Sequence, residues 1–402
     1  MAHSRPSPQL VEQRQQPHAS LVLFSFAYGS GVYRDPVLRL FLKGAAGCGA
    51  DIVMLSTLNA SARKAGITLP TNVRERSVTW RALASLLHRK FASSEPSIAF
   101  TKAHPFKTHD VKPLLPLLFP GLVHGYKWWG WVDWDTWVGD FRRLQSFLHG
   151  YRADIWTPGM ALWKAWLPDS RCTTSAHPPP PGTMSGASEC TQQVSWGPLT
   201  VVRNSPAYQL LWSRPENQRA ARFMLQQDGN TQFDEWGKYT HAHKAKHGAL
   251  SPVGYANSFS GILWRASLRG QLHLALDPKG LEQASLNADA LSCSYDPLSR
   301  PCFVPSKLRP GAGYCRMQVT AGGSTRLFQG AQSANVSAKG CVCEHEATIC
   351  HFPFKEGKRA AWRRLDERAV HNLLDARNLV ATRDASHPDP LGLYAVGKAL
   401  IT

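Results

Sequence analysis

The sequence contains no apolar segment long enough to cross a bilayer. Its longest early apolar stretch, residues 21–28, is far shorter than the roughly 20 residues that a membrane-spanning helix needs. The first 20 residues are polar and contain three prolines, whereas a secretory signal peptide has a basic start and an apolar centre. We therefore expect a cytoplasmic protein by default and keep the Golgi or secretory lumen as the alternative.

Acidic residues are scarce. The chain has 28 Asp and Glu against 46 Lys and Arg, which gives a formal net charge of +18. A basic surface favours anionic partners such as nucleotides, phosphosugars, nucleic acid or anionic lipids. The chain has no RRM, zinc-finger or helix-turn-helix signature, so nucleic acid stays a minor alternative. It also has no G-x-G-x-x-G or Walker loop, so a bound phosphate would depend on a metal ion rather than on a Gly-rich turn.

Strands and helices alternate along the first half of the chain. Residues 21–26 and 51–55 are short, mainly apolar runs, which are typical of buried strands. Asp35-Pro36 has the pattern of an N-cap followed by the first helical residue, and Thr79 could cap a second helix. We expect further strands at 97–101, 153–156 and 196–202, and helices at 113–119, 207–212, 219–226 and 355–378. This alternation predicts an α/β fold with a mostly parallel sheet and helices on both faces.

A Trp-rich run that begins at Tyr126 ends in Asp133-Trp134-Asp135. We interpret residues 126–132 as a strand buried on both faces. On an extended chain, residues i and i+2 point to the same side, so the two carboxylates share one place. They repel each other unless a cation or a proton lies between them, and Mg²⁺ or Mn²⁺ prefers such oxygen ligands. The alternative is a turn whose Asp residues cap the next helix, but Asp140 already stands at that place.

Six of the nine cysteines lie within residues 290–350. The run from Cys341 to His345, followed by Cys350-His351, resembles a zinc site, but C-x-C is not the C-x₂-C spacing of common structural sites. Disulfides, buried thiols and zinc remain alternatives for this region. A Pro-rich segment at 173–188 predicts a mobile insertion, and the cysteines that flank it could form a disulfide or remain free thiols.

Three blocks together resemble a little-characterised family of GT-A-type glycosyltransferases, close to those found with polysaccharide biosynthesis. The first is F-K-T-H-D-V-K-P at 106–113, similar to the family's Y-K-x-x-D-x-K-P. The second is W-G-x-x-D-x-D-x-x-x-G-D at 129–140, and the third is F-D-E at 233–235. The resemblance covers roughly residues 20–240 and implies a GT-A-like, Rossmann-like sheet. His109 departs from the pattern, because a small or apolar residue is usual there.

The resemblance implies a metal and nucleotide site. Asp135 would bind Mn²⁺ or Mg²⁺, Asp133 would contact the ribose or the metal, and His351 would complete the metal's protein ligands. Asp110 and Lys112 would lie near the nucleotide, where the Lys neutralises phosphate charge. The donor would be a nucleotide sugar, with a UDP-sugar favoured.

The resemblance also implies an acceptor side. Asp234 or Glu235 would act there, as general base in an inverting enzyme or as support for the sugar in a retaining one. Tyr28, at the end of the first strand, would lie near the nucleotide. The acceptor would be a glycan or another hydroxyl compound, and the resemblance does not decide the oligomeric state.

These features predict one main domain. We expect a disordered start at 1–19, a transferase domain at 20–289, and at 290–402 an irregular Cys-rich segment and a helix that pack on the same domain. Two other readings remain open: an inactive GT-A-like module that binds carbohydrate or a protein, and a basic nucleic-acid-binding protein.

Overall fold

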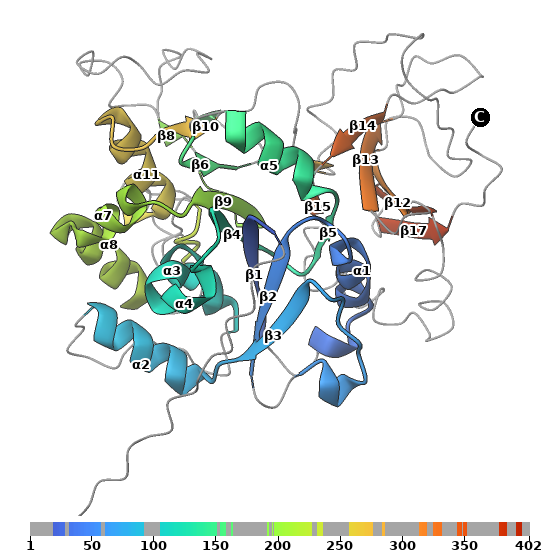
Figure 1. Ribbon diagram of the computed structural model, residues 1–402, viewed down its shortest axis with the longest axis horizontal. Helices are drawn as coiled ribbons and strands as arrows, with labels where there is room; N and C mark the ends of the chain where they lie inside the picture. Colours follow the sequence, from blue (N-terminus) through green and yellow to red (C-terminus); the bar gives the residue numbers. More distant parts are fainter. Residues whose placement is uncertain are drawn as a thin grey trace, which may run out of the picture.

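The computed structural model describes most of residues 19–275 and shorter pieces beyond them (Figure 1). The described residues are 19–28, 32–57, 61–91, 105–150, 153–157, 162–163, 191–192, 195, 197–226, 231–235, 257–275, 284–285, 313–319, 325–331, 344–347, 349–351, 378–383 and 391–395. No helix in these ranges is both long enough and apolar enough to cross a membrane.

A seven-stranded sheet forms the centre of the molecule, in the order β3-β2-β1-β4-β9-β6-β10. Its strands are β1 (Leu21–Ala27), β2 (Asp51–Ser56), β3 (Val73–Ser77), β4 (Trp128–Val132), β6 (Ile155–Trp156), β9 (Leu199–Arg203) and β10 (Leu274–Ala275). Only β9 runs antiparallel to its neighbours β4 and β6, and the other pairings in this sheet are parallel. The predicted α/β class with a mostly parallel sheet is therefore confirmed.

The central strands are buried on both faces because their side chains alternate between two cores. In β4, Trp129 and Trp131 belong to one core, and Trp128 and Val132 to the other. Successive strand residues point to opposite faces, so an apolar run without polar interruption needs a cover on each side. Helices supply both covers, as Figure 1 shows.

Helices α1 (Pro36–Ala45) and α5 (Phe141–Gly150) cover one face of the sheet. The other face is covered by α2 (Trp80–Phe91), α3 (Leu115–Leu118), α4 (Pro120–Val123), α7 (Pro206–Ser213), α8 (Pro215–Gln226) and α11 (Phe259–Leu268). A 3-10 helix, η3 (Pro105–Leu114), runs before α3. Two shorter 3-10 helices are η1 (Val32–Arg34) and η2 (Arg63–Ala65).

The predicted helix starts are confirmed by their hydrogen bonds. The side chain of Asp35 accepts from the N–H of Val37 at 3.0 Å, and Pro36 is the first residue of α1. Thr79 accepts from the N–H of Ala82 at 3.1 Å at the start of α2. Asp140 accepts from the N–H of Arg142 at 2.9 Å at the start of α5. Asp140 therefore caps this helix, as expected.

Several elements differ from the expectations. The polar edge strand β3 was not predicted, because its sequence V-R-E-R-S lacks the apolar run of a buried strand. The expected strand at 196–202 is β9, which begins at Leu199 and runs antiparallel. The expected strand at 97–101 and the insertion at 173–188 lie outside the described residues.

The region after residue 290 contains a five-stranded antiparallel sheet rather than only irregular chain. Its strands are β12 (Gly313–Val319), β13 (Thr325–Ala331), β14 (Glu344–Ala347), β16 (Asn378–Arg383) and β17 (Leu391–Ala395). In β12, apolar Cys315, Met317 and Val319 alternate with Arg316 and Gln318, a period-two pattern that cysteine spacing alone does not reveal. The expected helix at 355–378 lies outside the described residues except for its last residue, which begins β16.

Two smaller sheets complete the described elements. β7 (Leu162–Trp163) pairs with β8 (Thr191–Gln192), and β11 (Ala284–Ser285), β15 (Ile349–His351) and β5 (Thr136–Val138) form a separate three-stranded sheet. The three-stranded sheet matters for the site, because its strand β5 begins directly after Asp133 and Asp135, which follow the central strand β4.

We predict that Gly130→Ala strongly destabilises the fold. A Cβ atom at Gly130 would lie 2.2 Å from the backbone oxygen of Thr200 in β9, which cannot move without breaking the β4–β9 pairing. We expect a loss of about 3 kcal/mol or more in the free energy of unfolding, the upper end for overpacked cores. Gly66→Ala is the control, since Gly66 has open space and only a positive φ of 67°. It should lose about 1–2 kcal/mol. Equal losses in urea unfolding would contradict the packing argument.

Candidate functional site

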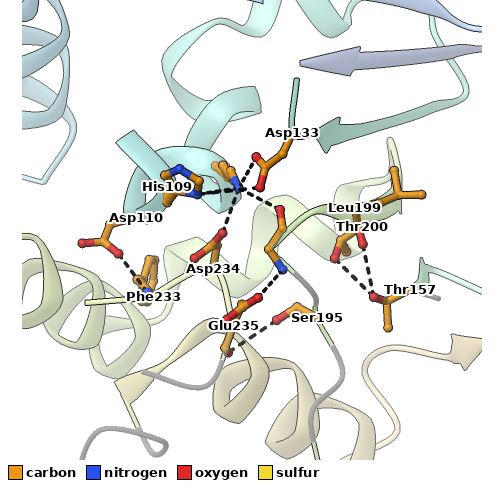
Figure 2. Close-up of polar contacts among 12 residues, drawn as sticks. His109, Asp110, Asp133, Thr157, Ser195, Leu199, Thr200, Phe233, Asp234 and Glu235 are labelled. Carbon is orange, nitrogen blue, oxygen red and sulfur yellow. Dashed lines mark hydrogen bonds and ion pairs between the residues drawn. The ribbon is translucent and has the colours of Figure 1, made fainter. Parts of the chain in front are cut away.

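The site begins where β4 ends. Asp133 follows the last strand residue, and its N–H donates to the carbonyl oxygen of Pro198 at 3.0 Å. This bond ties Asp133 to the chain that enters the antiparallel neighbour β9. The side chain then turns to a lysine on η3, where Asp133 Oδ1 lies 2.7 Å from Lys112 Nζ. Figure 2 shows the side chains of Asp133, His109 and Asp234 directed toward one another at this place.

Lys112 is almost fully buried, with 1% of its side chain exposed. Its Nζ also lies 3.1 Å from Asp234 Oδ2, 2.7 Å from the carbonyl oxygen of Gly197 and 2.9 Å from His109 Nδ1. Burial lowers the pKa of Lys112, but Asp133 and Asp234 together outweigh this effect and raise the pKa above its ordinary value. The group is therefore a permanent cation at neutral pH, suited to hold negative charge rather than to remove a proton.

Asp234 and Glu235 occupy different environments although they are neighbours. Asp234 is 1% exposed, and burial raises its pKa well above the ordinary value. Lys112 opposes this shift, and the charges of Glu235, Asp110 and Asp133 add to it. Glu235 is only partly buried, and its Oε1 accepts from the N–H of Gly197 at 2.8 Å. Of the two carboxylates, Glu235 is thus the more exposed to solvent.

Gly197 links the two halves of the cluster and was missed by the sequence analysis. Its carbonyl oxygen accepts from Lys112, and its N–H donates to Glu235. A Cβ atom there would lie 2.6 Å from Glu235 Oε1 and 3.2 Å from Asp234 Oδ2. The signal that could have found it is the Gly-Pro pair just before β9, a turn pattern at a strand start. His109, the departure from the family pattern, also lies in this cluster, with Nδ1 3.9 Å from Asp133 Oδ2.

Asp135 lies in the turn between β4 and β5 and is half-buried. The next residue, Thr136, pairs with His351 in the antiparallel ladder of β5 and β15. The backbone of His351 is thus brought beside the two aspartates from far along the chain, as a shared metal site would require. The side chain of His351 lies outside the described residues, so its role as a ligand stays a prediction.

Two other predicted site residues are enclosed by protein. Asp110 is fully buried, and its two oxygens accept from the N–H groups of Thr231 and Phe233. Tyr28 is 5% exposed, its hydroxyl donates to the carbonyl oxygen of Val78 at 2.8 Å, and burial raises its pKa. Asp110 lies two residues before Lys112 on η3, whereas Tyr28 contacts Val78, Phe26 and Trp80. Their contact with a nucleotide stays a prediction.

The cluster carries an excess of negative charge in a basic protein. Its acidic members exceed its lysines by two when Asp110, Asp133, Asp234 and Glu235 are counted against Lys107 and Lys112. Asp135 adds a further carboxylate nearby. Carboxylate oxygens suit a hard divalent cation such as Mg²⁺ or Mn²⁺. No group of three or more His, Cys, Asp and Glu is arranged to hold a metal among the described side chains, which do not include that of His351.

No family model and no curated protein matches the sequence. Among solved structures, the apo form of mouse xyloside xylosyltransferase 1 matches with a TM-score of 0.36 and 11% identity. The match covers 66% of this chain and 87% of that one.

The raised pKa of Asp234 predicts a pH dependence of stability. Its folded-state pKa lies above the ordinary value of 3.8, so the folded protein binds this proton more tightly than the unfolded chain. The resulting stabilisation is present below pH 3.8 and is lost as the pH rises through the folded-state pKa. Asp234→Asn removes it. The free energy of unfolding of the wild type minus that of the variant should therefore fall as the pH rises above 3.8, measured by urea unfolding. If this difference in unfolding free energy instead grew with pH, the charge of Lys112 would outweigh burial and lower the pKa of Asp234.

Proposed function

We propose that this protein is a metal-dependent glycosyltransferase that moves a sugar from a nucleotide-sugar donor to a hydroxyl group of a glycan or another acceptor. The observation that carries the proposal is the convergence of Asp133 and Asp234 on the buried ammonium of Lys112. This cluster lies at the carboxyl end of β4, the edge where open α/β sheets bind ligands.

The donor side would be formed by Asp133, Asp135 and His351. Their oxygen and imidazole groups would hold Mn²⁺ or Mg²⁺, which neutralises charge on the two phosphates of a bound donor. Lys112 contributes a fixed positive charge whose place is set by three oxygen partners. A fixed charge of this kind stabilises the departing nucleoside diphosphate without having to reorganise during the reaction. A UDP-sugar is the favoured donor on the resemblance of the sequence blocks.

The acceptor side would be formed by Glu235. Transfer joins the acceptor oxygen to the anomeric carbon, and the bond from that carbon to the diphosphate breaks, with its electron pair leaving on the diphosphate. In an inverting reaction Glu235 takes the proton of the acceptor hydroxyl. In a retaining reaction the leaving phosphate takes that proton, and Glu235 supports the sugar. Asp234 is less suited to either task, because it is enclosed and shares Lys112 with Asp133.

We predict that Mn²⁺ and a nucleoside diphosphate together stabilise the wild type far more than either does alone. Occupancy at 100 times Kd adds about 2.7 kcal/mol to the free energy of unfolding. Asp135→Asn should abolish this joint shift while folding normally, because it removes a charge with little change in shape. Asp140→Asn is the matched control, since Asp140 caps α5 and pairs with Arg142. Thermal-shift curves that are equal with and without metal would rule out the metal site.

Glu235→Gln should separate donor binding from transfer. Gln can still accept from the N–H of Gly197, so the local structure is retained while the basic group is lost. We expect unchanged affinity for donor diphosphate with Mn²⁺, measured by calorimetry, and a transfer rate about 10²–10⁴-fold lower.

The control for this experiment is Glu216→Gln, an exposed carboxylate on α8 that should change neither quantity. If the donor affinity of Glu235→Gln fell in step with its rate, Glu235 would belong to the metal and donor side instead.

A further inference from the structure

The structure contains a second buried ion pair, on the same 3-10 helix as Lys112, which the proposed function does not use. Lys107 and Asp110 are both fully buried, and Lys107 Nζ lies 2.9 Å from Asp110 Oδ2. Lys107 also donates to the carbonyl oxygen of Met224 at 2.8 Å, near the end of α8. Isolating two charges from water costs several kcal/mol for each ion, which the pair offsets only when its remaining hydrogen bonds are satisfied.

Asp110 satisfies its remaining bonds on the backbone just before the two acidic residues. Its Oδ2 accepts from the N–H of Thr231 at 3.0 Å, and its Oδ1 from the N–H of Phe233 at 2.9 Å. Between these two donors, Gln232 has a φ of 52°, a left-handed conformation that non-glycine residues rarely adopt. Successive N–H groups in such a turn form a concave anion-binding site, and here the anion is a carboxylate of the protein itself.

The other side of the same segment is attached to α11 and to the aromatic core. The N–H of Phe259 donates to the carbonyl oxygen of Phe233 at 2.8 Å, and the N–H of Ser260 donates to that of Glu235 at 3.0 Å. The ring of Phe233 contacts Trp212 edge-on, with 6.3 Å between centroids. Residues 231–235 are thus held from two directions, and Asp110 provides the contacts on the side of η3.

We propose that Asp110, with Lys107 as its buried counter-ion, is a positioning residue for Glu235 and Asp234. It fixes the backbone of residues 231–233 in its left-handed turn, so that the two carboxylates that follow are presented to Lys112 and Gly197. This role replaces the expected contact of Asp110 with the nucleotide. The inference rests on the proposed function, because only a catalytic task for the carboxylates makes their position matter for rate.

The test uses Asp110→Asn and the double variant Lys107→Met/Asp110→Asn. The double variant leaves no unpaired charge in the interior. The same quantities can therefore be measured on it if the single variant folds poorly. Three quantities are measured for each: amide hydrogen exchange of residues 231–235, affinity for nucleoside diphosphate with Mn²⁺, and kcat and KM for transfer. We expect faster exchange, unchanged affinity and donor KM, and kcat about 100-fold lower, the scale of a small misplacement of a catalytic group.

Tyr126→Phe serves as the matched control. Its hydroxyl donates to the buried Asp51 at 2.6 Å, outside the contacts of residues 231–235, so the variant loses a buried hydrogen bond of similar kind. It should lower thermal stability and leave both kcat and the exchange of residues 231–235 unchanged. A fall in kcat for this control equal to that of Asp110→Asn would overturn the positioning role, since lost stability alone would then explain the effect.

Other outcomes separate this inference from the proposed function. A normal kcat in the Asp110 variants would overturn the positioning role but not the proposed function. A loss of donor affinity in step with kcat would instead show that Asp110 contacts the nucleotide. If the wild type neither binds nucleoside diphosphate nor transfers sugar, the proposed function fails. Hydrogen exchange then still decides whether Asp110 holds the segment, and unaltered exchange in the variants overturns that too.

Discussion

One buried ammonium group holds the site together. Lys112 brings three separate parts of the chain to within hydrogen-bond distance: the end of the central strand at Asp133, the turn before β9 at Gly197, and the acidic pair at Asp234. A buried charge without partners costs several kcal/mol, so removing either the lysine or its carboxylates leaves the other side uncompensated. The positions of the acidic groups are therefore coupled to one another through a single atom, the Nζ of a lysine on η3.

The site has an excess of acidic groups, whereas the whole chain has an excess of basic ones. The chain carries a formal charge of +18, which draws anionic ligands from solution. The cluster around Lys112 is acidic, so an anionic ligand would meet repulsion there unless a cation accompanied it. A diphosphate bound together with a divalent ion satisfies both conditions. This argument from charge explains why one protein would combine a basic surface with carboxylates such as Asp133 and Asp135 at the end of its central strand.

Local patterns made the buried strands β1, β2 and β4, the helix caps and the acidic end of β4 predictable, because each depends on a few neighbouring residues. The buried run before Asp133 and the cap at Asp140 are examples. Contacts between segments that are distant in the sequence could not be predicted from such local patterns. The enclosure of Asp110 depends on a turn more than a hundred residues later, and the approach of β15 to β5 depends on strand pairing. Gly197 has no side chain to attract notice, although its backbone joins the cluster.

The most direct test of the account is X-ray diffraction at the manganese absorption edge, on crystals grown with Mn²⁺ and a nucleoside diphosphate. The account predicts one strong anomalous peak beside Asp135 at the carboxyl end of β4, with the diphosphate bound to the same ion and Lys112 still held by Asp234. A diphosphate bound there without an anomalous peak would contradict it, as would manganese bound elsewhere while the carboxylates around Lys112 stay unoccupied.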